Sequence, residues 1–319
     1  MNWIPEDLSC YSSLYMDGML RMHPDMWEKL TADPGSAALV RKGFDRSRYA
    51  TVICGGGAHG PLFPGFVWDG LADAAVVGGP FSAPNAEIVY EACRALAGDS
   101  GVLLLYNNFM GDFLNNDMAS ELLSLEGVPV ENVIATDDIA TAPRADRQER
   151  SGRIGIAWLI KLSAVCAARG MSLTEAAGVL RRAMERLGTV SMHADPVART
   201  AEYGRGFSGE PGFEKLENAD MEKAVRRALE LLEADLRPAA GERAYLLINR
   251  MHNMSYFDSC RMGAIAAGYL DERGGCGCLR VGNYLTNIDV YGCDFSVLYA
   301  DAGLSSLLDG TVRTDSFTI

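Results

Sequence analysis

The sequence predicts an α/β protein of two domains, each built on a mainly parallel or mixed sheet flanked by helices. Short apolar runs of strand length alternate with helical patterns, which is typical of sheets with much parallel pairing. The chain has 319 residues, and domains commonly hold roughly 150. We place the boundary near a helix end, which gives domains of residues 1–186 and 187–319.

The first half alternates strand and helix patterns. An amphipathic pattern, interrupted at His23-Pro24, predicts a helix over 14–30. A polar and charged stretch predicts an exposed loop over 140–153. Strands are expected at 49–54, 74–79, 101–106 and 132–136, and helices at 84–97 and 113–126.

The second half begins with two long helical patterns. Glycine-rich sequence over 196–216 predicts loops, and the end of the chain, from Leu279 to Tyr299, is expected to be mostly extended. Helices are expected at 154–170, 173–187, 220–236 and 257–271, and strands at 187–193 and 245–249.

Composition excludes several classes of function. A net charge of −13 argues against nucleic acid, whose phosphates attract basic surfaces. The chain shows neither a Lys/Arg cluster suited to an anionic membrane nor the apolar region of a signal peptide. Cys276-Gly277-Cys278 lacks a second pair or a nearby histidine, so no metal site is expected, and eight scattered cysteines suit a reducing cytoplasm.

Gly55-Gly56-Gly57-Ala58-His59-Gly60-Pro61 is the most informative motif. It follows an apolar run of strand character. Glycines leave a backbone that side chains do not cover, so a small ligand can approach it. The histidine that follows places a proton carrier there. The motif therefore predicts a site for a small polar molecule.

Two further residues are candidates for chemistry. Asp112 follows the third strand, and with His59 it could share general acid–base work on a hydroxyl, although local sequence alone favours a cap on the helix that begins near 113. His193 has a side chain that, as a neutral imidazole, could add to a carbonyl, or it could be a hydrogen-bonded histidine at a strand end.

The loops that follow the four strands expected in the first half of the chain are polar or glycine-rich, and they would converge on one crevice.

Three nucleotide or hydrolase motifs do not fit. The chain contains no Gly-Lys pair, which a P-loop requires. Gly55-x-Gly57-x-x-Gly60 has the dinucleotide-binding spacing but is followed by Pro61 rather than by a helix. The glycines around Ser208 have the wrong spacing for a nucleophile elbow.

Together these stretches resemble the DhaK subunit of dihydroxyacetone kinase over nearly the whole chain. The glycine motif is similar to the family's Gly-Gly-Gly-Ser-Gly-His-Glu-Pro, and Asn108–Asp112 is similar to part of its Lys-Asn-Tyr-Thr-Gly-Asp. Further matches, in order, are Gly79–Pro84, Asp137-Asp138, Gly152-Arg153-x-Gly155, Leu187-Gly188-Thr189, Gly209-Glu210-Pro211-Gly212 and Gly282–Asp289.

The resemblance implies a substrate-binding subunit that helps to phosphorylate dihydroxyacetone or a related short ketose. His193 would hold the ketose covalently as a hemiaminal, Asp112 would activate its hydroxyl, and His59 would assist. The residues implied to line the substrate are Gly56, Gly57, Ala58, His59, Asn107 and Asp112. The chain itself would bind no cofactor or metal. No nucleotide domain follows residue 319, so a partner subunit would carry ATP or ADP, and a homodimer is expected.

The chain also departs from the family pattern. Its glycine motif is one residue shorter and has Gly60 in place of the glutamate, and Asn107 stands where a lysine is expected. Ser208 replaces a histidine, and the segment around His193 is shortened. The alternative is therefore a non-catalytic ketose-binding paralogue that regulates a partner. The sequence does not name the ketose or the phosphoryl donor.

Overall fold

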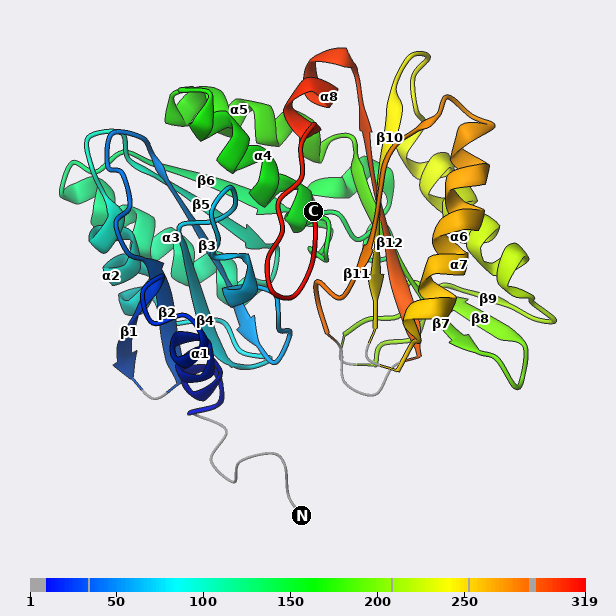
Figure 1. Cartoon of the computed structure of the whole chain (residues 1–319), viewed down its shortest axis with the longest axis horizontal. Helices are drawn as coiled ribbons and strands as arrows, with labels where there is room; N and C mark the ends of the chain where they lie inside the picture. The colour runs from blue at the N-terminus through cyan, green and yellow to red at the C-terminus, as the bar shows by residue number, and fades with distance from the viewer. Residues whose placement is uncertain (1–9, 34, 208, 252, 287–290) are drawn as a thin grey trace. The chain divides into compact units, whose positions relative to one another are not determined.

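The structure is a computed structural model that describes residues 10–33, 35–207, 209–251, 253–286 and 291–319 (Figure 1). It divides into two compact units: Met1–Ile134 with Ile160–Arg181, and Ala135–Leu159 with Arg182–Ile319. The expected division at 186/187 differs from this one at residues 135–159 and 182–186, which group with the second unit. Within residues 135–159, Asp137 accepts hydrogen bonds from the Arg153 and Gly155 amides, and its bond from the Thr189 hydroxyl ties this segment to the rest of the second unit.

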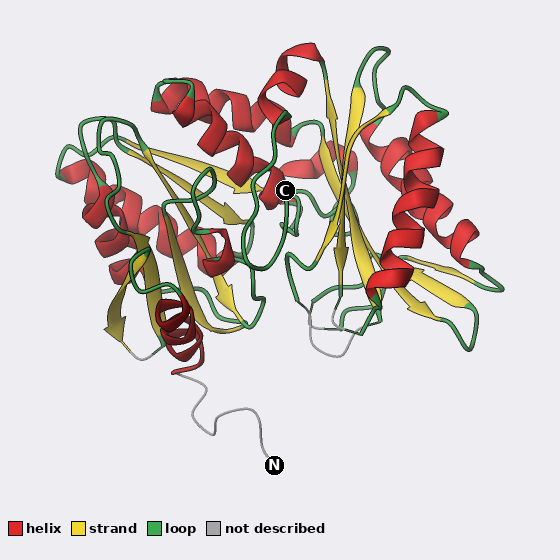
Figure 2. Cartoon of the chain, in the orientation of Figure 1, coloured by secondary structure: helices red, strands yellow, loops and turns green. Residues whose placement is uncertain are grey.

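Both units combine helices with strands (Figure 2). Up to the first long connection they are α1 (Tyr11–Met22), β1 (Trp27–Asp33), β2 (Ser36–Arg41), β3 (Ala50–Gly57), β4 (Ala74–Pro80), α2 (Ala86–Leu96), β5 (Val102–Asn107), α3 (Met110–Leu125) and β6 (Val130–Ala135). Then follow α4 (Ile156–Ala168), α5 (Leu173–Met184), β7 (Leu187–Asp195), β8 (Thr200–Tyr203), β9 (Glu214–Leu216), α6 (Met221–Leu236), β10 (Arg243–Arg250), α7 (Tyr256–Asp271), β11 (Cys276–Gly282), β12 (Gly292–Ala300) and α8 (Ala302–Leu308). Short 3-10 turns lie at Pro64–Phe66 and Arg144–Glu149.

The first unit is built on a mixed sheet of order β1-β2-β4-β3-β5-β6. Its centre is parallel, because β3 pairs in parallel with both β4 and β5, whereas β1 and β2 add antiparallel pairs. Alternate residues of the strands pack against α2 and α3 in one apolar cluster. The carboxyl ends of β3, β4 and β5 therefore lie at one edge of this sheet, which is where parallel sheets present ligand-binding loops.

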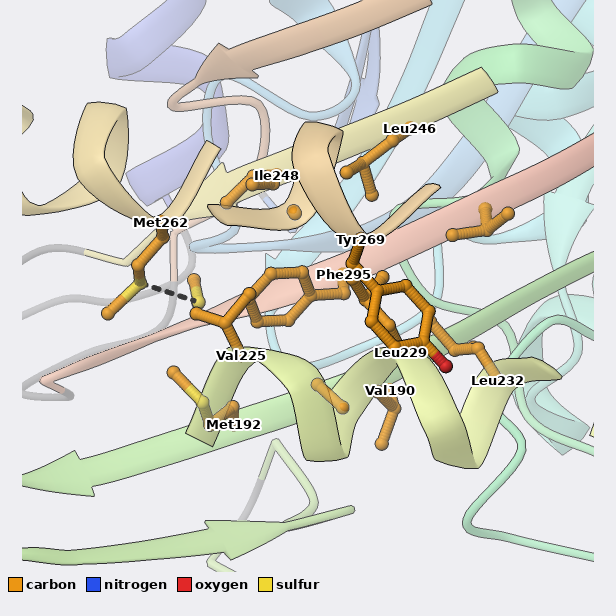
Figure 3. Close-up of a cluster of buried hydrophobic side chains, with 14 of the residues drawn as sticks. Val190, Met192, Val225, Leu229, Leu232, Leu246, Ile248, Met262, Tyr269 and Phe295 are labelled. Atoms are coloured by element: carbon orange, nitrogen blue, oxygen red, sulfur yellow. Dashed lines mark hydrogen bonds between the residues drawn. The ribbon is translucent and has the colours of Figure 1, made fainter. Parts of the chain in front are cut away.

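The second unit has another mixed sheet, of order β11-β10-β12-β7-β8-β9, in which only β10 and β11 pair in parallel among the pairings described. One face packs against α6 and α7, and Figure 3 shows this core around Phe295 and Tyr269. Val190 and Met192 of β7 point into that core, so the alternate residues of β7 point to the opposite face. Those residues are polar: Thr189, Ser191 and His193.

The two mixed sheets with flanking helices confirm the predicted α/β class. The predicted helix over 14–30 was wrong in its second half. α1 ends at Met22, and Trp27–Asp33 forms β1, because Pro24 ends the helix. Trp27 is buried and its indole N–H donates to the Val67 carbonyl at 2.8 Å. The stretch 196–216, expected to be loops, contains β8 and β9.

The predicted exposed loop over 140–153 was also wrong for two of its charged residues. Arg150 and Arg153 are almost completely buried. Arg150 binds Asp235 through both terminal nitrogens, at 2.9 and 2.6 Å. Buried arginines of this kind persist because carboxylates pair with them, and such partners are distant in sequence.

Candidate functional site

The three glycines at the end of β3 serve different purposes. A Cβ on Gly55 would lie 1.9 Å from Cε2 of Phe63, and one on Gly57 would lie 2.6 Å from the Gly78 carbonyl oxygen. The close packing of Phe63 and of the Gly78 backbone therefore requires glycine at these two positions. Gly56 is different, because its nearest neighbour atom would be 3.4 Å away and the residue is partly exposed. Gly56 is thus the glycine that a ligand can approach.

His59 is positioned by the loop that follows β4. Ala58, just before it, has a φ of 69°, the left-handed region that turns the chain at this point. The Phe81 amide donates to the Gly57 carbonyl at 3.2 Å. The rings of His59 and Phe81 then meet edge to face, with centroids 5.2 Å apart. The imidazole is therefore placed at the carboxyl end of β3 by contacts on two segments.

Asp112 is not the cap of its helix, so that alternative was wrong. α3 begins at Met110 with Phe109 as its N-cap residue, which makes Asp112 the third helical residue. Its side chain is buried, and Oδ1 has no hydrogen-bond partner among the described residues. Burial raises the pKa of the Asp112 carboxyl to about 7. A carboxyl with this pKa can exchange a proton near neutrality, as a general base must.

Two residues close to Asp112 in the sequence also have buried side-chain oxygens that accept no hydrogen bond from the described residues. Asn107 ends β5, is buried, and has a side-chain oxygen without a partner in the described chain. Asn116 lies one turn beyond Asp112, donates to the Asp112 carbonyl at 2.7 Å, and also has an unpaired side-chain oxygen. Buried acceptors are rarely left unpaired, so these oxygens indicate a place for hydroxyl groups or water.

His59 and Asp112 border the same loop, Gly79–Pro84. His59 contacts Phe81, and a Cβ added to Gly111, next to Asp112, would lie 3.1 Å from the Ala83 Cβ. The structure therefore brings these two predicted residues to one edge of the first sheet.

Ser208, which replaces a histidine of the family pattern, lies outside the described residues.

His193 belongs to the second unit. It lies on the polar face of β7, opposite Gly292 of β12 and Glu202 of β8. Its Nε2 is buried and has no hydrogen-bond partner among the described residues, so the alternative of a fully hydrogen-bonded histidine was wrong. Burial, together with the charges of Arg153 and Arg205, lowers the pKa of His193 to about 4. The imidazole is thus neutral near pH 7, which leaves a nitrogen lone pair available.

Beside His193 lies a buried ionic network that the sequence analysis did not place in the site. Arg153 Nε donates to Asp294 at 3.1 Å, and its Nη1 donates to Asp138 at 3.0 Å. Asn249 donates to the other Asp294 oxygen at 2.9 Å. In the sequence, Asp137-Asp138 and Gly152-Arg153 stand out only as motif matches. The buried partner Asp294 carried no local signal, since it sits in an apolar strand.

Metal and membrane signals are not found in the described chain. No group of three His, Cys, Asp or Glu side chains there is arranged to hold a metal ion. Within the same residues, no helix combines the length and apolar character needed to cross a bilayer. All eight cysteines are free thiols.

The fold and these residues define an α/β protein with glycine-rich and polar loops at the carboxyl ends of parallel strands. The chain belongs to the Dak1 domain family, whose model matches residues 17–316. A dihydroxyacetone-binding subunit DhaK of a PTS-dependent dihydroxyacetone kinase from Listeria innocua is 30% identical over 307 residues, covering 90% of this chain and 91% of that protein.

Solved structures share the fold. The dihydroxyacetone kinase of C. freundii has a TM-score of 0.85 at 24% identity, covering all of this chain and 61% of the other. A dihydroxyacetone kinase operon co-activator, Dha-DhaQ, has a TM-score of 0.82 at 21% identity, with 99% and 98% coverage. At these identities the likeness concerns the fold alone.

Proposed function

We propose that this chain is the ketose-binding subunit of a dihydroxyacetone-type kinase. The observation that supports it best is a pair of buried groups with unused hydrogen-bonding atoms, Nε2 of His193 and Oδ1 of Asp112. One has the lowered pKa of a nucleophilic imidazole and the other the raised pKa of a general base. The name of the Listeria relative, a dihydroxyacetone-binding subunit, agrees with this assignment.

In the proposed reaction His193 Nε2 adds to the carbonyl carbon of the ketose. A C–N bond forms, the π electrons of the C=O bond move to oxygen, and that oxygen gains a proton as the imidazole loses one from Nδ1. The product is a neutral hemiaminal. Glycerol has no carbonyl and cannot form this bond, so the step selects ketoses over polyols.

Phosphoryl transfer would then involve the first unit. Asp112 accepts the proton of a substrate hydroxyl as its oxygen attacks phosphorus, and His59 orients that hydroxyl or relays the proton. Gly56 to Ala58 and Asn107 line the substrate in this proposal. A separate nucleotide-bearing subunit would hold the phosphoryl donor, which is either ATP or a bound ADP that a phosphotransferase has loaded with a phosphoryl group.

We also propose that the chain acts in the cytoplasm and forms a homodimer. Light scattering of the purified chain measures the mass of the assembly and so tests the homodimer.

Reconstitution tests the kinase proposal. The chain is mixed with its cognate nucleotide-bearing subunit and donor, and phosphate esters are measured with dihydroxyacetone, erythrulose and glycerol. We expect turnover of one or both ketoses and none of glycerol. If no ketose is phosphorylated with any cognate partner, the kinase assignment fails.

A second candidate is a ketose-binding regulator without turnover. It is favoured by Gly60, which replaces the acid expected after the histidine, and by Asn107, which replaces a lysine. A regulator would bind ketose and, only when loaded, a partner protein, while producing no phosphate ester. Calorimetry with ketose, followed by partner binding with and without it, separates this function from the kinase.

A further inference from the structure

Arg153 is held rigidly in the second unit. It is fully buried, and its guanidinium binds Asp294 and Asp138 and also donates from Nη1 to the Arg205 carbonyl at 3.1 Å. The Phe207 ring lies against the guanidinium, 4.3 Å from ring centroid to Cζ. These contacts fix the plane of the group, so its remaining N–H groups point in set directions.

The Nη2 nitrogen of Arg153 has no hydrogen-bond partner among the described residues. A buried charged donor without a partner is costly, and such groups are uncommon in folded proteins. Every other nitrogen of this guanidinium donates to a named acceptor. The unused nitrogen therefore indicates an acceptor that a ligand supplies.

Arg153 and His193 serve the same face of the second sheet. Asp294, which holds Arg153, pairs with Ser191 across β7 and β12, and His193 follows Ser191 by two residues on the same side of β7. The Ser191 hydroxyl donates to the same Arg205 carbonyl as Arg153, at 2.9 Å. Two buried nitrogens without partners, an acceptor and a donor, thus lie along one face.

The strand position opposite His193 carries no side chain. Gly292 pairs with His193, and a Cβ there would lie 2.3 Å from the Met192 carbonyl oxygen and 3.1 Å from the His193 Cα. Glycine therefore keeps the β12 side of the imidazole free of a side chain. The charged groups of the second unit that act on His193 are Arg153, Arg205 and Glu202.

We propose that Arg153 is a catalytic residue whose Nη2 N–H binds the oxygen of the substrate carbonyl while Nε2 of His193 adds to the carbon. This inference rests on the proposed covalent step. As the C–N bond forms, negative charge collects on the carbonyl oxygen, and a fixed cationic donor stabilises that charge. The oxygen is then protonated as His193 loses its Nδ1 proton, and Arg153 keeps all of its own protons.

The test uses dihydroxyacetone labelled with ¹³C at the carbonyl and follows the conversion of that carbon from sp² to sp³ by NMR. The wild-type chain is expected to form the adduct and His193→Gln to form none. Arg153→Lys keeps the charge but loses the planar fork, and it should reduce the adduct equilibrium constant about tenfold or more. Arg150→Lys is the matched control. Arg150 is also a buried arginine, lies three residues before Arg153 and pairs with Asp235, so this variant should form the adduct like the wild type.

The outcomes separate the two proposals. If the wild type forms no adduct, the proposed covalent step at His193 is wrong. If Arg153→Lys forms as much adduct as the wild type, Arg153 has no role in the step. Should that variant not fold, the wild type alone decides, through the arginine side-chain ¹⁵N–¹H signals. Adduct formation should shift one slowly exchanging Nη signal, and no shift in any arginine signal overturns the assignment.

Discussion

The imidazole of His59 meets the ring of Phe81 edge to face, with ring centroids 5.2 Å apart and an angle of 84° between the planes. Phe81 is about half exposed, at 53%, so the contact is made at the surface of the loop rather than in the core. The loop after β4 therefore sets the orientation of a histidine that follows β3. Sequence distance hides this dependence, since the two residues belong to different motifs.

Replacing Phe81 by alanine should weaken substrate turnover without unfolding the protein. An aromatic edge contact is worth about 0.5–1.5 kcal/mol, so we expect kcat/KM to fall by roughly twofold to tenfold. Phe257→Ala is the control, because Phe257 is 70% exposed on α7 of the second unit. Equal kinetics in the wild type and Phe81→Ala would show that His59 needs no support from this ring.

Gly57→Ala should destabilise the first unit. The added Cβ would lie 2.6 Å from the Gly78 carbonyl oxygen and 3.0 Å from that of Gly79, and backbone atoms cannot move aside cheaply. Overpacking of this kind costs about 1–3 kcal/mol. Urea unfolding measures the loss. The control is Gly268→Ala on α7, where nothing lies within 4 Å of the new Cβ, and a gain of up to about 1 kcal/mol is expected.

The central strands could be predicted because parallel strands are buried on both faces and so are almost continuously apolar. Val102–Asn107 and Ala74–Pro80 follow this pattern, with only the last residues of Ala74–Pro80 partly exposed. Strand β1 could not be predicted, because its sequence has the periodicity of a helix. Pairing with β2 and burial of Trp27 override that pattern in the folded protein.

Candidate site residues could be named from the sequence, but their electrostatics could not be predicted from it. His59, Asp112 and His193 are candidates that motifs indicate, whereas the burial that shifts the pKa values of the last two comes from the packed fold. Arg153 was assigned to an exposed loop because its neighbours are charged. Its partner Asp138 follows β6 and bridges to Thr189 of β7, and its partner Asp294 lies on β12, which pairs with β7. No local pattern of a single sequence reveals these pairings.

Adduct formation should be nearly constant with pH through the neutral range. Burial and the charges of Arg153 and Arg205 lower the pKa of His193 to about 4, so Nε2 loses its lone pair to a proton only below that pH. An ordinary histidine would lose it below about 6.5. The ¹³C adduct signal measured between pH 4 and 8 checks this. Arg205→Gln should move the midpoint upward, whereas an unchanged midpoint would limit the cause to burial and the charge of Arg153.

Asp112→Asn should abolish phosphoryl transfer and leave the carbonyl adduct at His193 intact. Loss of a general base lowers kcat by about 10²–10⁴. In the wild type, burial raises the pKa of Asp112 to about 7, so kcat should rise with pH through neutrality as the carboxylate forms. Asp117→Asn, an exposed carboxylate on the same helix, should keep wild-type rates. A pH-independent kcat in the wild type would remove Asp112 from the role of base.

The same substitution should stabilise the fold at high pH. Because the folded-state pKa of Asp112 is raised above its ordinary value of 3.8, the folded protein holds a proton that the unfolded chain has lost between about pH 4 and pH 7. Stability therefore falls as pH rises through this window and stays low above it. At pH 8, Asp112→Asn should gain about 2–4 kcal/mol in unfolding free energy, and the gain should shrink toward zero near pH 4. Urea unfolding at both pH values measures it, with Asp117→Asn expected to show no such trend. A gain that is equal at pH 4 and pH 8 would mean that the carboxyl is not destabilised by its burial.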